Sequence, residues 1–348
     1  PLHRYRWIHN LPFFYGWVIV FLGAFSMFAT TPGQSDSFSF YMNSFVKEFG
    51  LSRTFVSSLY SSATLLSGFL MFFVGRLVDR VGSKWVAILA AILLGIACML
   101  TSYAISPIML FLGFFLARLA GKGALDLSAS TLAPQWFITR RALVIMLVGL
   151  GGTAGGVLFP LLNTYLITTF GWRAAFRFLA GGLWLIYVPV TLVFLISRPE
   201  DVGMSPENTS RPQDDSSSTT YAHEEPSFQR SQAIRTFAFW AIALCVFQST
   251  LVGTGVVLHF VSIAETQGFS MSFAAKVMGM KPLISLITTV LAGLVLDRIG
   301  RYHYILAAAC LLQVVGYMLL AFLSTANMAF LYALVGGIAG GLISICVG

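Results

Sequence analysis

Charged residues at helical spacing lie inside an apolar segment of this chain. Arg118, Lys122 and Asp126 follow one another at intervals of four residues, which places them on one face of a helix. Another cation, Lys281, stands in a second apolar segment, directly before Pro282. Cations buried in this way can bind a carboxylate, and a buried lysine can also lose its proton. We therefore predict that Arg118 and Lys281 contact an anion or a proton. Lys122 and Asp126 are candidates for the same contacts, but we favour a structural ion pair for them.

Other roles stay open for these residues and for several polar ones. Arg118 can instead be structural, with its guanidinium fixed by carbonyl groups of neighbouring helices. Five further residues in apolar segments are candidates for hydrogen bonds to a substrate: Tyr41, Asn43, Asn163, Gln248 and His259. Each of them taken alone is more often a polar residue that joins two packed helices.

The segments that must position these residues are strongly apolar. Of the 348 residues, 57% are hydrophobic and 10% are charged, against roughly 25% charged in an average soluble domain. One water-soluble core could not hide so many apolar side chains without very large exposed patches. The composition predicts an all-α polytopic membrane protein. It excludes a disordered chain, a disulfide scaffold and almost any soluble enzyme of this size.

Apolar runs long enough to cross a bilayer recur along the chain. A spanning helix needs about 20 mostly apolar residues, and ten runs meet this condition. They cover residues 13–45, 53–78, 84–104, 107–134, 142–168, 173–197, 237–264, 272–297, 302–323 and 327–348. We expect Pro32-Gly33 to break the first, because proline removes a backbone donor and clashes with the preceding turn.

One long polar stretch divides these runs into two sets. Residues 198–235 are rich in Asp, Ser and Thr and cannot bury enough apolar surface to fold alone. We read them as a linker between an N-terminal six-helix bundle, 1–197, and a C-terminal bundle, 236–348, that holds helices seven to ten. Most loop Lys and Arg residues fall on the side of the N-terminus and the linker, which predicts that both are cytoplasmic.

A short motif occurs twice, each time where the second helix of a bundle is expected to end. Its form is G-x-[LV]-x-D-R-x-G. The first copy contains Gly75, Asp79, Arg80 and Gly82, and the second contains Gly293, Asp297, Arg298 and Gly300. Such an internal repeat predicts two similar halves related by an axis along the membrane normal.

On these motifs the chain resembles the major facilitator superfamily of secondary transporters. A narrower set is similar to the monocarboxylate-porter and oxalate:formate-antiporter branch: Phe14-Tyr15-Gly16-Trp17, residues 135–141 and residues 198–203. The resemblance implies two pseudo-symmetric bundles, of which this chain, truncated at both ends, holds about ten of twelve helices. It also implies that the repeated motif is a conformational latch. The chain departs from the anion-transporting relatives at Thr288 and Thr289, where an arginine is usual.

The function expected from these features is secondary active transport by alternating access. We expect a small, monocarboxylate-like organic anion to move together with a proton, through a monomer in the plasma membrane of a bacterium. The alternatives are a transporter of neutral or amphiphilic compounds and, more remotely, a membrane sensor with a transporter fold. No catalytic or nucleotide-binding motif is visible, so we expect no enzyme activity, no cofactor and no metal. The net charge of +8 follows the loops, so nucleic acid is not an expected partner.

Overall fold

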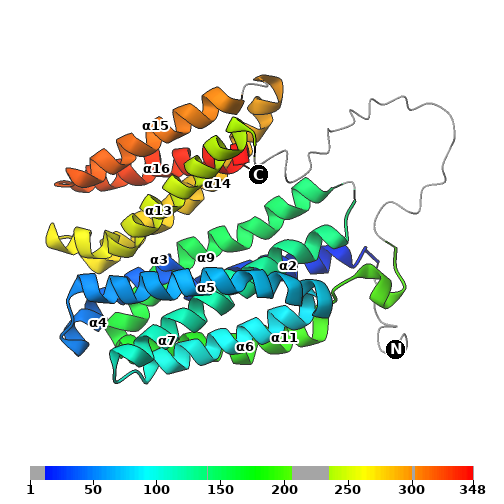
Figure 1. The fold of residues 1–348 in the computed structure, drawn as a ribbon, viewed down its shortest axis with the longest axis horizontal. Coiled ribbons are helices and arrows are strands. Elements are labelled where there is room, and N and C mark those ends of the chain that lie inside the picture. The colour runs from blue at the N-terminus through cyan, green and yellow to red at the C-terminus, as the bar shows by residue number, and fades with distance from the viewer. Residues whose placement is uncertain (1–11, 139, 206–234, 300–301, 348) are drawn as a thin grey trace.

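The computed structural model describes residues 12–138, 140–205, 235–299 and 302–347. These residues form helices, turns and connections, and no strand occurs among them (Figure 1). Within the described ranges, ten helical spans are long and apolar enough to cross a membrane. Large apolar side chains such as Leu185, 79% exposed, and Phe69, 77% exposed, cover their outer faces. A lipid surrounding accounts for such a surface, and the expected all-α membrane fold is confirmed.

The first six spans pack into one group, coloured blue to green in Figure 1. Its helices are α2 (Gly16–Ala29), η2 (Thr31–Gly33), α3 (Ser35–Ser39), α4 (Met42–Phe49), α5 (Arg53–Val81), α6 (Ser83–Ser102), α7 (Pro107–Ala117), η3 (Arg118–Leu125), α8 (Asp126–Leu132), η4 (Ala133–Gln135), α9 (Arg141–Phe170), α10 (Trp172–Gly182), η5 (Leu183–Tyr187) and α11 (Val188–Phe194). The short helix η6 (Pro199–Val202) follows.

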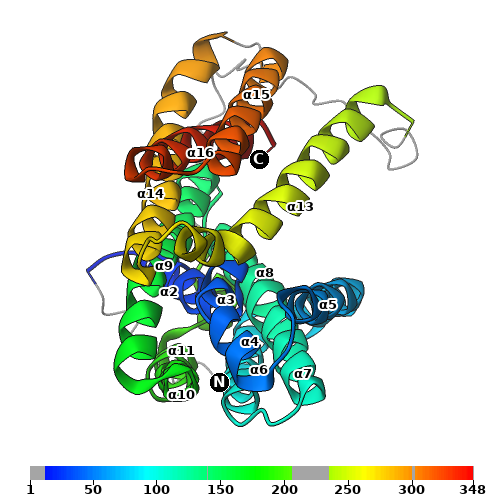
Figure 2. The ribbon, with the colours of Figure 1, turned by 90° about the vertical axis from the view of Figure 1, so that its left-hand side faces the viewer.

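Four longer helices make up the second group, coloured yellow to red. They are α13 (Phe237–Thr266), α14 (Met271–Ile299), α15 (Tyr302–Ala321) and α16 (Ala326–Val347). The groups touch where α14 packs on α9 and where α13 packs on α3 and α4 (Figure 2). Most of the polar stretch 198–235 lies outside the described residues, so the boundaries 1–197, 198–235 and 236–348 stay a prediction.

Besides the contact between α9 and α14, the second group packs on the first through one end of α13. Along α13, the side chains near its start are exposed, with Phe237 at 88% and Trp240 at 60%. Towards its other end, Leu258, Phe260 and Val261 are 4% exposed or less. We call this second end, which holds α4 and the first turn of α5, the closed end; it lies on the left in Figure 1. The chain therefore packs tightly across the groups at the closed end and more loosely at the other.

Three of the described spans depart from α-helical geometry. The sixth contains the π-helix η5, and the departures in the first and fourth shape the centre of the molecule. The first span breaks at η2, where Pro32 stands at the start of a 3₁₀ turn, and restarts as α3. In the fourth span, the segment η3 is a π-helix, a form that recurs at functional sites. The two meet because Gly33 lies against the Ala117 carbonyl and Gly121, which leaves no room for a Cβ.

Candidate functional site

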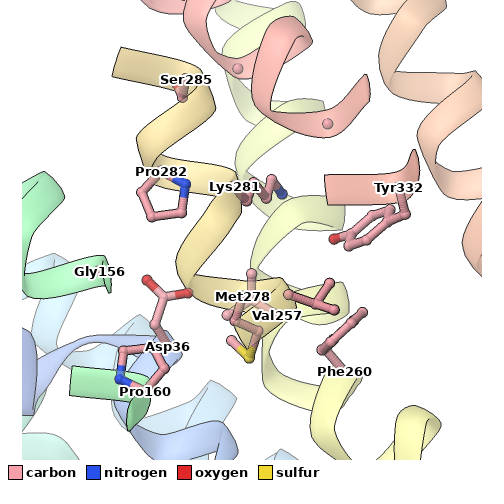
Figure 3. Close-up of a pocket in the computed structure, with 13 residues that line it drawn as sticks. Asp36, Gly156, Pro160, Val257, Phe260, Met278, Lys281, Pro282, Ser285 and Tyr332 are labelled. Carbon is pink, nitrogen blue, oxygen red and sulfur yellow. The ribbon is translucent and has the colours of Figure 1, made fainter. Parts of the chain in front are cut away.

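A cavity lies between the two helix groups, near the middle of the spans. Its volume is about 270 Å³. The first group contributes residues of α3 and α9, and the second contributes residues of α13, α14 and α16 (Figure 3). The lining residues are Asp36, Gly156, Pro160, Val257, Phe260, Val277, Met278, Lys281, Pro282, Ser285, Tyr332, Gly336 and Gly340. The lining is mostly apolar and carries one acidic and one basic side chain, one from each group.

The basic side chain, Lys281, reaches the cavity from α14 (Figure 3). Its Nζ lies 5.5 Å from the ring centroid of Tyr332, close enough for a cation–π contact. The Tyr332 ring stacks in turn on Phe260, with centroids 5.5 Å apart and planes 18° apart. Within the described ranges Lys281 forms no ion pair. Its charge is therefore open to an anion that enters the cavity.

The acidic side chain, Asp36, belongs to the first turn of α3, directly after the break in the first span. Its carboxylate points into the cavity below Pro282 (Figure 3). Three cations act on the charge of Asp36: Lys281 most strongly, then Lys122, then Arg118. A buried carboxylate surrounded by cations can either balance their charge or exchange a proton with a substrate.

A buried hydrogen-bond chain fixes the helix that carries Asp36. The Tyr41 hydroxyl donates to Asn163 Oδ1 at 2.9 Å, and Asn163 Nδ2 donates to Ser37 Oγ at 2.9 Å. Tyr41 and Asn163 are fully buried. These hydrogen bonds therefore tie α3 and the start of α4 to α9. They occupy Tyr41 and Asn163, which were both candidates for substrate contact. Neither lines the cavity.

The arrangement of two helix groups around one central cavity agrees with comparisons to known proteins. The family model described as the Major Facilitator Superfamily matches residues 16–348. The chain belongs to the Major Facilitator Superfamily. It resembles a bacterial homologue of the human lysosomal transporter Spinster, solved in an inward-facing and occupied conformation, with a TM-score of 0.70 and 16% identity over 95% of this chain and 72% of that one. At this identity the likeness shows the fold.

Sequence relatives within the superfamily include transporters of different kinds. The MFS-type transporter pynF of Aspergillus niger is 24% identical over 95% of this chain and 73% of its own length. The monocarboxylate transporter 14 of Mus musculus is 29% identical over 56% of this chain, which spans only 37% of that relative. A gallate transporter of Pseudomonas putida is 25% identical over 86% of this chain and 70% of its own length.

In this superfamily member, Arg118 lies beside the break in the first span and does not line the cavity. Its Nη1 donates to the Gly33 carbonyl at 3.3 Å, and its guanidinium carbon lies 5.6 Å from the Tyr60 ring centroid. Its Nε is buried and has no hydrogen-bond partner in the described part of the chain. The contact with Gly33 favours the structural alternative for Arg118.

Lys122 and Asp126 form an ion pair one turn further along the fourth span. Lys122 Nζ lies 3.4 Å from both carboxylate oxygens of Asp126, and 46% of the Lys122 side chain is exposed. An exposed pair of this kind contributes little stability. Arg118 is not part of this pair, because its guanidinium contacts Gly33 and Tyr60 instead.

Asn43 lies at the closed end, in a polar cluster that joins the two groups. Arg53 Nη2 donates to Asn43 Oδ1 at 3.0 Å, and Ser262 Oγ donates to the same oxygen at 2.9 Å. Asn43 Nδ2 donates to the Glu265 carboxylate. Asn43, Arg53, Ser262 and Glu265 make up what we call the end clamp. Asn43 therefore joins α4 and α5 to α13 rather than facing the cavity.

The other two polar candidates belong to α13 and also lie outside the cavity lining. His259 Nε2 is 3.3 Å from Ser57 Oγ of α5, so this pair adds a second polar link between the groups near the end clamp. Gln248 is half-buried, nearer the opposite end of α13. Neither position supports contact with a ligand in the cavity of this conformation.

The first copy of the repeated motif closes α5. Asp79 and Arg80 are exposed in its last turn, and Gly82 adopts a left-handed φ of 89° that ends the helix. Gly75 has open space around it. The second copy contains Gly293, Asp297, Arg298 and Gly300. The structure describes only the helical backbone of its residues up to 299, and Gly300 lies outside the described ranges. The latch role therefore stays a prediction.

Asp36 is the residue that sequence reasoning missed. Arg118 and Lys281 were noticed because an ionisable residue in a spanning helix is costly. The same rule applies to Asp36, since the first span runs from Gly16 to Ser39. The break at Pro32-Gly33 hides the depth of Asp36, because the sequence does not show how far the first span continues beyond it. In the described cavity, α9 rather than the fourth span lies beside α3.

We expect the end clamp to hold the two groups together. Replacing Asn43 by Leu removes three polar contacts at once, each contributing about 0.5–1.5 kcal/mol. Spin labels are placed at Lys47 of α4 and Gln267 after α13, both exposed. Pulsed electron resonance should then show a long-distance population at least about 5-fold larger than in wild type, because two of the lost contacts join the groups. Glu48→Gln is the control, because Glu48 pairs with Arg173 inside the first group at 3.1 Å. An unchanged distance distribution in Asn43→Leu would contradict a clamp role.

Proposed function

We propose that this chain is the transporting core of a secondary active transporter that moves a small organic anion together with a proton. The observation that carries the proposal is the central cavity, where Lys281 of one group and Asp36 of the other face the same space. A cation without an ion pair at this depth is costly unless an anion visits it. A carboxylate bound to Lys281 would supply that partner.

The charge balance of the cavity supports coupling to a proton. Among the residues that line the cavity, the negative charge of an ionised Asp36 offsets the positive charge of Lys281. An entering carboxylate adds a negative charge next to Asp36, and two carboxylates that share one site favour protonation of one of them. Protonation of Asp36 would restore the balance when the substrate is bound. One proton would therefore accompany each carboxylate.

The size and walls of the cavity favour an acid larger than the smallest monocarboxylates. A volume of about 270 Å³ corresponds to roughly nine waters at ~30 Å³ each. Phe260, Tyr332 and Met278 give the walls an apolar and partly aromatic character. The gallate transporter of Pseudomonas putida and the gentisate transporter of Corynebacterium glutamicum are among the relatives. We therefore propose a carboxylate that carries a ring or a branched apolar body.

The way the groups touch supports alternating access as the mechanism of this proposed transporter. We assign the closed end to the outside of the cell, because the side of the N-terminus carries most loop Lys and Arg residues. The contacts across the end clamp and between α13 and α3 then close the outer path. Opening this end and closing the other would move the cavity between the two sides of the membrane.

Uptake by proteoliposomes tests the proposal. Labelled aliphatic and aromatic carboxylates and one neutral aromatic compound are supplied with and without an inward proton gradient. We expect accumulation of a ring-containing carboxylate, faster with the gradient, and none of the neutral compound. Uptake of the neutral compound alone would favour the alternative of a transporter for neutral or amphiphilic molecules. Binding without uptake of any compound would favour a sensor.

The latch gives a separate prediction. Asp79→Asn should slow transport by about 5- to 20-fold, because a charged contact near a helix end would be lost in one conformation only. Insertion and thermal stability should be unchanged, since Asp79 is exposed in the present conformation. Uptake rate and melting temperature are measured together, with Glu48→Gln as the matched acidic control. Wild-type rates in Asp79→Asn would exclude the latch.

A further inference from the structure

A groove on the side of the bundle crosses the contact between the two helix groups. It has a volume of about 350 Å³ and lies where α9, α14 and α16 meet. Gly279 forms part of its floor, because a Cβ there would lie 3.2 Å from the Val157 carbonyl oxygen of α9. The backbones of α9 and α14 therefore lie in close contact at Gly279, and the neighbouring side chains form the walls of the groove.

The walls are apolar and open to the surroundings. Leu161 of α9 is 44% exposed, Leu283 of α14 is 45% exposed, and Phe330 of α16 is 36% exposed. All three belong to candidate membrane spans, so the groove opens towards lipid. Lys276 of α14 is the one charged residue in its lining.

Lys276 stands at the end of this groove that is nearer the membrane surface. It lies five residues after the start of α14 at Met271, which corresponds to ~8 Å at ~1.5 Å per residue. A half-bilayer core is ~15 Å thick, so a lysine at this depth can reach the headgroup layer. Lys276 is exposed and forms no ion pair among the described residues.

We propose that this groove binds one anionic phospholipid of the leaflet at the closed end. The phosphate contacts Lys276, and one acyl chain follows the groove past Gly279 and Met280 towards Leu283. From the membrane surface inwards, Lys276 comes first and the apolar walls follow. A phospholipid presents its phosphate and then its acyl chain in the same order. The lipid would touch α9 and α14 together, so it bridges the two helix groups. The site is separate from the central cavity and does not depend on the proposed transport activity.

Native mass spectrometry of the purified chain, titrated with phosphatidylglycerol and separately with phosphatidylcholine, tests this site. Wild type should bind one phosphatidylglycerol more tightly than further lipids and about fivefold more tightly than phosphatidylcholine, since one lysine near the surface acts on one lipid charge. Lys276→Gln should remove this preference. Met280→Trp should weaken the first binding event for both lipids, because the indole fills the acyl-chain path.

Two control variants separate a specific site from general lipid contact. Lys47→Gln removes another exposed cation at the closed end, and Leu185→Trp adds an indole to a lipid-facing position, 79% exposed in wild type, far along the chain from the groove. Both should bind phosphatidylglycerol as wild type does. The proposal is overturned if Lys276→Gln and Met280→Trp bind like these controls. It is also overturned if wild type forms dimers whose loss in Met280→Trp shows that a second copy fills the groove.

Discussion

Lys281→Gln is expected to lower the affinity for a carboxylate substrate by about 10- to 100-fold. A hydrogen bond to a charged group contributes ~1.5–3 kcal/mol, and each ~1.4 kcal/mol changes a dissociation constant tenfold. Gln keeps the length and some hydrogen bonding but loses the charge. The half-saturation concentration for uptake of the best carboxylate, and its dissociation constant by calorimetry, should rise together.

Two further variants show whether the charge of Lys281 or its shape matters. Lys281→Arg keeps the charge and should recover part of the affinity, because the larger, planar guanidinium presents its charge with a different geometry. Lys47→Gln removes an exposed cation outside the cavity and should bind substrate as wild type does. If Lys281→Gln binds the carboxylate normally, the anion site lies elsewhere.

Lys281 was predictable because its chemistry is local in the sequence. A single cation within an apolar run costs free energy to bury in any fold, so it is expected to have a charged partner or to face a cavity. Its neighbours were not predictable. Tyr332 and Phe260 come from two other helices, and their stacking below Lys281 depends on how α13, α14 and α16 pack.

Arg118 shows a limit of reasoning from spacing. An interval of four residues predicts a shared helix face, but it does not reveal that Arg118 lies against Gly33 at the break in the first span. The Tyr41–Asn163 hydrogen bond shows another limit, because it joins residues 122 positions apart. Both polar side chains stand out in the sequence, but only the packing of α3 and the turn after it on α9 reveals that they satisfy each other.

Asp36 is hard to place from the sequence for two reasons. The break at Pro32 hides its depth in the membrane, and the charged groups around it come from helices that are distant in the sequence. The charged and titratable groups around it come from several elements: Lys281 on α14, Lys122 and Arg118 on η3, Tyr60 on α5 and Tyr332 on α16. Burial disfavours the charged form of Asp36, and three of the five groups are cations whose charges act in the opposite direction. A bound carboxylate would take over the interaction with Lys281, which leaves Asp36 as the group that must gain a proton.

Asp36→Asn is therefore expected to uncouple transport from the proton gradient. Asn resembles a protonated Asp, so the variant should bind substrate and exchange it across the membrane within about twofold of wild type. A gradient of one pH unit supplies ~1.4 kcal/mol per proton, enough for about tenfold accumulation by a coupled carrier, and this accumulation should disappear in the variant. Counterflow exchange and gradient-driven uptake are measured in the same proteoliposomes, with Glu48→Gln as the control. Loss of both activities would mean that Asp36 is needed for the fold or for binding, and persistence of accumulation would mean that the proton is carried by another group.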